Sequence, residues 1–220
     1  MITFWGKLGL VLFAFCSNRL ELLAQRPPNM VMMEYKVTVT SIDSSAGFLN
    51  GSTLLIYLNH DECREEIRSP DGGEIRFFNS KTGKGAILKN YSGQKLQVPL
   101  SRDNWTELNT FYNSISFTVE NVEDAVICGY LAKKAKAQLP GNRELVVYFA
   151  PGFVPANQLY SYAFPQLKGL PLKIERHTPD ATFVWELNDI QFGNLPPALF
   201  DINTKGYRLL PFEVLQVPLP

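Results

Sequence analysis

The chain has 220 residues, of which 45% are hydrophobic and 12% aromatic, enough for one sizeable core and too apolar for a disordered polymer. Its 21 basic and 21 acidic residues give a formal net charge of +0, so no positive excess favours nucleic acid as a partner. Fifteen glycines and 15 prolines, spread along the chain, are typical of many short strands separated by turns.

Residues 1–24 are predicted to form a secretory signal peptide. Lys7 supplies a positive charge, residues 8–16 form a weakly polar to apolar run, and Ala24 before Gln25 offers a cleavage point. This run is too short to cross a bilayer, so no stable transmembrane span is expected. The mature protein would be exported to the periplasm or cell envelope and begin with an exposed leader at 25–31.

The first half of the mature chain is predicted to be a β-meander. From Met32 to Thr40, apolar and polar side chains alternate with period two, as a half-buried strand requires. Turn-forming residues then separate short segments rich in branched, aromatic or alternating side chains. These segments are expected to be strands at 52–58, 63–68, 74–79, 85–91 and 95–98.

A short helix is expected at 103–112, where Trp105, Leu108 and Phe111 recur at helical spacing after Asp103 as a possible N-cap. Further strands are predicted at 115–122, 125–139, 143–149, 170–177 and 182–192, with another helical turn within 154–164. About eleven strands and one or two short helices predict a mainly β fold, a curved antiparallel sheet that forms a half-open barrel. A single domain would span 32–210, followed by a C-terminal tail at 211–220.

No catalytic or metal-binding constellation stands out in the sequence. His60 and His177 lie in separate turn regions without the paired spacing of metal ligands. Glu65 and Glu66 are neighbours whose side chains point to opposite faces of a strand, and both are expected to be surface charges. We therefore predict no metal, no cofactor and no enzymatic activity.

After removal of the signal peptide, Cys63 and Cys128 are the remaining cysteines. They permit one disulfide in an oxidising compartment. The alternative is that both are free cysteines, small residues buried in strands. We favour it because the sequence gives no Cα–Cα distance that would support a disulfide.

Large apolar side chains outnumber plausible catalytic groups. They either fill the core or line a pocket for an acyl chain or another apolar ligand, covered by the short helical segments. Patterning alone favours the core, because aromatic strand residues usually pack within their own fold.

Several segments carry a resemblance to known exported proteins. In chain order they are Ile127-Cys-Gly-Tyr-Leu-Ala-Lys-Lys-Ala135, Arg143-Glu-Leu-Val-Val-Tyr148, Lys168-Gly-Leu-Pro-Leu-Lys-Ile-Glu175, and Leu199-Phe-Asp-Ile202 with Gly206-Tyr207. Together they resemble the uncharacterised exported proteins of Bacteroidetes that have a LolA/LolB-like domain and are related to the GLPGLI family. The resemblance extends over residues 32–210.

This resemblance implies a half-open barrel with a helical lid, in a superfamily whose studied relatives bind lipids or lipoproteins. The function it predicts is non-catalytic binding of a hydrophobic ligand, a lipid or lipoprotein acyl chain, in the concave face of the sheet. The alternative is an interaction module with a closed core and no ligand, which docks another envelope protein. The side chains we select as the ligand lining are Trp105, Phe111, Tyr148, Phe183 and Trp185.

Overall fold

The computed structural model describes residues 30–41, 49–121 and 125–216, so the predicted signal peptide lies outside the described residues. The strands are β1 Val31–Ser41, β2 Thr53–Leu58, β3 Glu62–Ser69, β4 Gly72–Asn79, β5 Lys84–Tyr91, β6 Gln94–Ser101, β7 Thr118–Val119, β8 Ala125–Ile127, β9 Tyr130–Leu139, β10 Arg143–Pro151, β11 Gly169–His177, β12 Ala181–Phe192 and β13 Arg208–Leu209. The helices are α1 Arg102–Ser114 and the short 3-10 helices η2 Pro165–Leu167, η3 Pro197–Leu199 and η4 Phe212–Gln216.

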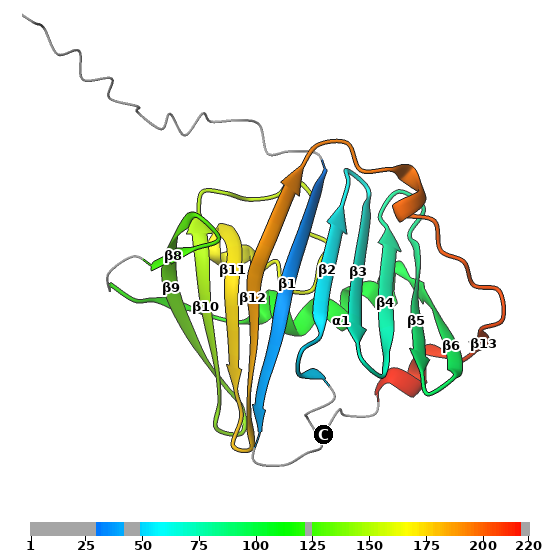
Figure 1. The fold of residues 1–220 in the computed structure, drawn as a ribbon, viewed down its shortest axis with the longest axis horizontal. Coiled ribbons are helices and arrows are strands. Elements are labelled where there is room, and N and C mark those ends of the chain that lie inside the picture. Colours follow the sequence, from blue (N-terminus) through cyan, green and yellow to red (C-terminus); the bar gives the residue numbers. More distant parts are fainter. Residues whose placement is uncertain (1–29, 42–48, 122–124, 217–220) are drawn as a thin grey trace, which may run out of the picture.

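The strands form one open, curved sheet, as predicted (Figure 1). Their order is β13-β6-β5-β4-β3-β2-β1-β12-β11-β10-β9-β7, and β8 adds to β9. Neighbours are antiparallel except β13 and β6. The meander β1 to β6 extends to one side of β1, and β12 pairs with its other side. The first strand therefore lies in the middle of the sheet.

The predicted helix is present and begins with a capping box. Ser101, rather than the expected Asp103, is the N-cap: its Oγ accepts from the Asn104 backbone N–H at 3.2 Å. In return, the Ser101 N–H donates to Asn104 Oδ1 at 2.9 Å. These two bonds satisfy backbone groups that would otherwise have no partner at a helix start.

Two expected elements differ from the structure. The single strand predicted at 125–139 is a hairpin of β8 and β9, because Cys128 and Gly129 both adopt positive φ, 50° and 80°, as a tight primed turn requires. The segment expected to hold a helical turn, 154–164, runs as bends and turns, and η2 follows it.

The sheet has an inner and an outer face with different coverings. We define the cover as α1 together with residues 152–168; it packs on the inner, concave face, where the main core lies. On the outer face, Leu55, Tyr57 and Phe200 form a small second cluster. The described part of the predicted tail also packs on the protein, because Phe212 is buried in the main core.

Candidate functional site: the inner face and its cover

Three of the five predicted lining residues lie on the inner face, and all three are buried. Trp105 projects from α1, is 5% exposed, and stacks on Phe78 with ring centroids 5.0 Å apart. Phe183 and Trp185 follow each other on the inner side of β12, with centroids 6.0 Å apart. Phe183 and Trp185 therefore contact each other on β12, whereas Trp105 contacts Phe78 of β4.

The other two residues point away from the inner face. Phe111 is 45% exposed, because six residues of helix rotate it about 120° away from Trp105. Tyr148 follows the inner-facing Val147 on β10 and so points outward. There, the Nζ atoms of Lys134 and Lys173 lie 5.8 and 5.7 Å from its ring centroid. Helix rotation and strand alternation therefore separate the five residues.

The cover contacts the sheet through a chain of aromatic rings. Tyr112 of α1 lies 5.1 Å from Tyr162, and Tyr162 lies 5.6 Å from Trp185 of β12, measured between centroids. Phe164 is fully buried and meets Phe117 edge-on at 5.3 Å. The cover is thus held on the sheet largely by apolar side chains.

Within the cover, next to the start of β11, lies a small cavity of about 10 Å³, room for about one water molecule. Its lining comes mostly from the cover: Val154, Pro155, Gln158, Tyr160, Ala163, Phe164, Pro165, Lys168 and Gly169. Sites for small ligands commonly measure about 300–1,000 Å³. Within the described part of the chain, the protein's own side chains fill the place where the sequence predicted an unfilled trough. In this conformation, an acyl chain needs the cover to move.

Two residues of the cover adopt strained backbone conformations. Phe164 and Lys168, on either side of η2, have φ values of 42° and 48°. Such left-handed conformations cost of order 1–3 kcal/mol for residues other than glycine, and they are rare for bulky side chains. Packing of the cover must offset this strain.

A buried carboxylate fastens the cover to β3. Glu65 is 5% exposed, and its Oε1 accepts from the backbone N–H of Ser161 at 2.6 Å and from the Ser161 Oγ at 2.9 Å. Burial raises the pKa of Glu65, although the charge of Arg76 and the two bonds from Ser161 oppose the rise. The prediction of a surface charge is wrong for Glu65. The signal for an inner position was that Glu65 lies two positions from both Cys63 and Ile67, and therefore on the same face of the strand.

Next to Glu65, charges pair along the inner face. Arg76 is the cross-strand neighbour of Glu65, and its Nε lies 2.7 Å from Glu74 Oε1. The Nζ of Lys89 lies 3.1 Å from Glu74 Oε2. Burial raises the pKa of Glu74, but the charges of Arg76 and Lys89 outweigh it, and the net shift is downward. Glu74 therefore stays ionised and neutralises these cations.

Arg176 of β11 has no such carboxylate. Its Cζ lies 4.5 Å from the ring centroid of Phe183, its cross-strand neighbour, and 5.8 Å from that of Trp185. Its Nε is buried without a hydrogen-bond partner, and among residues 30–41, 49–121 and 125–216 no acid lies within ion-pair distance. Sequence reasoning did not select Arg176, although it lies two positions after the inner-facing Ile174 and therefore on the same face of β11.

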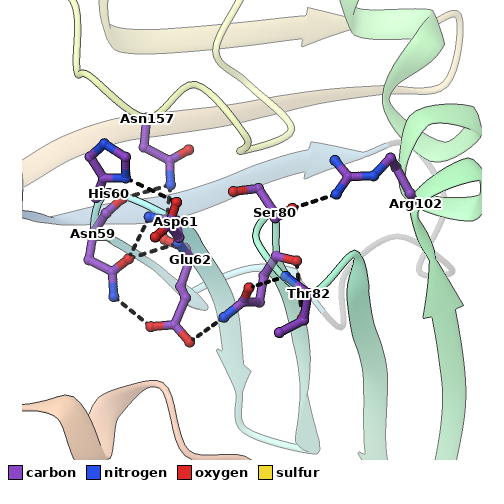
Figure 2. A network of polar contacts seen from close by, with 9 residues as sticks. Asn59, His60, Asp61, Glu62, Ser80, Thr82, Arg102 and Asn157 are labelled. Carbon is purple, nitrogen blue, oxygen red and sulfur yellow. Dashed lines mark hydrogen bonds and ion pairs between the residues drawn. The ribbon is translucent and has the colours of Figure 1, made fainter.

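A polar network fixes the start of the cover to the turns at one end of the sheet (Figure 2). Asn157 Nδ2 donates to the backbone oxygens of Asn59 and Glu62 at 2.7 and 3.0 Å. Arg102, at the start of α1, donates to the backbone oxygen of Ser80. Amide and carbonyl groups satisfy one another here, so the network is structural.

The described part of the chain contains no group of three or more His, Cys, Asp or Glu side chains that could hold a metal. His60 lies in an exposed turn, where its Nδ1 lies 3.0 Å from Asp61 Oδ1. Cys63 is buried in β3, Cys128 is exposed in the β8–β9 turn, and both thiols are free. Within the same residues, no helix is both long and apolar enough to span a bilayer.

No protein-family model and no curated protein sequence matches this chain. Three solved structures illustrate its similarity to known folds. PNGF-II is 15% identical, with a TM-score of 0.49 over 86% of this chain and 33% of its own, so this chain spans about a third of PNGF-II. An uncharacterised conserved protein from Thermus thermophilus is 12% identical, with a TM-score of 0.48 over 82% of this chain and 90% of its own.

A LolA superfamily protein from Nitrosomonas europaea is 8% identical, with a TM-score of 0.36 over 80% of this chain and 92% of its own. A LolA superfamily protein is among the structures similar to this chain, and the GLPGLI relationship and a Bacteroidetes origin stay predictions.

Proposed function

We propose that this chain is a non-catalytic protein of the periplasm or cell envelope that binds a hydrophobic ligand, a lipid or a lipoprotein acyl chain, between the inner face and the displaced cover. The observation that carries the proposal is the construction of the cover. It is a separate layer that packs through aromatic rings on an apolar sheet.

Features of the cover support its displacement. Phe164 and Lys168 store backbone strain that opening would release. Beneath the cover, the buried hydroxyl of Tyr160 has no hydrogen-bond partner, a cost that hydration would remove. Each feature lowers the free energy of opening.

An acyl chain has enough apolar surface to replace the cover. Burial of each CH₂ group is worth about 0.8 kcal/mol, and exposure of one large apolar side chain costs about 1.5–3 kcal/mol. A dozen methylenes therefore offset the exposure of several cover side chains, among them Tyr162 and Phe164.

Mass spectrometry of an organic extract tests the proposal. The mature protein, produced with export to the periplasm and shown to be folded, is expected to carry lipid in stoichiometric amount. Phe183→Ala is expected to lower the retained lipid, because Phe183 lies on the inner face. Tyr148→Ala is the matched control, because Tyr148 lies on the outer face. A lipid-free extract from folded protein that also fails to bind added dodecanol would refute the proposal.

A second function is favoured by the filled inner face itself. Because large side chains already occupy that face, a closed interaction module that docks another envelope protein is the alternative. Capture of one stoichiometric partner by lipid-free protein, with no uptake of dodecanol, would support this alternative.

A further inference from the structure

The cations on the inner face outnumber the carboxylates. Arg76 and Lys89 pair with Glu74, and Glu65 lies beside Arg76. Arg176 remains without a carboxylate among the described residues, while its Nε is already removed from water. A guanidinium in this state gains more from an incoming anion than a solvated one, since part of its desolvation has already taken place.

The surroundings of Arg176 are aromatic. Phe183 lies against its guanidinium group, and Trp185 follows on the same strand. Tyr162 of the cover packs on Trp185. Burial and the neighbouring Tyr112 raise the pKa of Tyr162, although the charges of Arg76 and Arg176 oppose the rise. The phenol therefore stays protonated and can donate a hydrogen bond.

We propose that Arg176, together with the hydroxyl of Tyr162, binds the carboxylate head of an amphiphile whose alkyl chain lies over Phe183 and Trp185. The planar fork of Arg176 suits the two oxygens of a carboxylate. The rings beside it provide the apolar surface for the first methylenes. This inference rests on the proposed function and narrows its ligand to anionic lipids such as fatty acids.

The test compares dodecanoate with dodecanol, which has the same chain without the charge, by titration calorimetry at a pH where the carboxylate is ionised. We expect wild-type protein to bind dodecanoate at least about tenfold more tightly, the lower range for a charge-assisted hydrogen bond. Arg176→Gln is expected to abolish this preference, so that the variant binds dodecanoate and dodecanol with similar affinity. Arg208→Gln, on an exposed strand, removes the same charge and should change neither affinity.

The outcomes separate the inference from the proposed function. Equal binding of both ligands by wild-type protein, or an unchanged preference in Arg176→Gln, would overturn the carboxylate site alone. Binding of neither ligand would overturn the hydrophobic-ligand function as well. Acetate that binds through Arg176 as tightly as dodecanoate would show a site for free small anions and likewise overturn the inference.

If Arg176→Gln does not fold, salt dependence in the wild-type protein provides the second measurement. Added sodium chloride is expected to weaken binding of dodecanoate and to leave that of dodecanol nearly unchanged, because screening acts on the charged head. An equal response of both ligands to salt would contradict the proposal.

Discussion

At the scale of single residues, Glu65 and Glu66 show how one step along a strand reverses the environment of a carboxylate. Glu65 faces inward and is surrounded by the core and Ser161. Glu66 faces outward, where Arg64 Nη2 and Arg68 Nε each lie 2.7 Å from it. Burial raises the pKa of Glu65, whereas at Glu66 the bonds and charges of the two arginines outweigh burial and lower it.

These opposite shifts predict opposite effects of pH on stability. A raised pKa in the folded state means that Glu65 contributes stability below the pKa of an unfolded carboxyl, about 4.3, which is lost as pH rises through the folded value. Glu66 contributes stability above that pH, and it is lost as pH falls. Urea unfolding should show that the free energy of unfolding of Glu65→Gln increases relative to wild type as pH rises. Near neutral pH, the free energy of unfolding of Glu66→Gln should be about 1 kcal/mol lower than that of wild type. The same pH trend in both variants would contradict the assigned faces.

Lys168 provides a residue-scale test of strain in the cover. Its φ of 48° is unfavourable for a side chain with a Cβ, and its side chain is exposed. Lys168→Gly should therefore raise the free energy of unfolding by about 0.5–1 kcal/mol, and the melting temperature by about 2–4 °C per kcal/mol. Lys168→Ala retains the Cβ and should show no gain. Equal effects of the two substitutions would show that the backbone there is unstrained.

At the scale of elements, the sequence predicts those whose cause is local. The strands β1 to β6 follow from alternation and turn residues, and α1 follows from helical spacing, although its N-cap is Ser101 and not the predicted Asp103. The β8–β9 hairpin escapes prediction because its turn places Cys128, an unusual residue for positive φ, beside Gly129. The cover between 152 and 168 escapes for another reason: its shape comes from tertiary packing of rings and has no period.

The candidate site was predictable in part for the same reason. Aromatic strand residues pointed to Phe183 and Trp185, and the structure places both on the inner face. Glu65 was predicted from its charge to lie on the surface, and Arg176 was not selected, although each lies two positions from a buried residue on the same strand. Which cation lacks a partner depends on pairing between strands far apart in sequence, and this pairing cannot be read from one strand.

At the scale of the whole molecule, the sheet and the cover differ in how they are held. The central strand β1 pairs along its length with β12 and over six residues with β2. The cover contacts the sheet through side chains and isolated hydrogen bonds, such as that between Ser161 and Glu65. The backbone hydrogen bonds between buried central strands break only when the whole fold unfolds. A layer held by side chains can detach in a local opening.

Native-state hydrogen exchange at increasing denaturant measures this difference. The amides of Leu159, Ser161 and Ala163 are expected to exchange through an opening with a lower free energy and a smaller denaturant slope than the amides of β1 and β12, which require global unfolding. Added dodecanol should change exchange in the cover and leave the central strands protected. If cover and sheet exchange with one free energy and one slope, they form a single cooperative unit. Uptake of a lipid beneath the cover would then require global unfolding, and the closed interaction module would be the function that the structure supports.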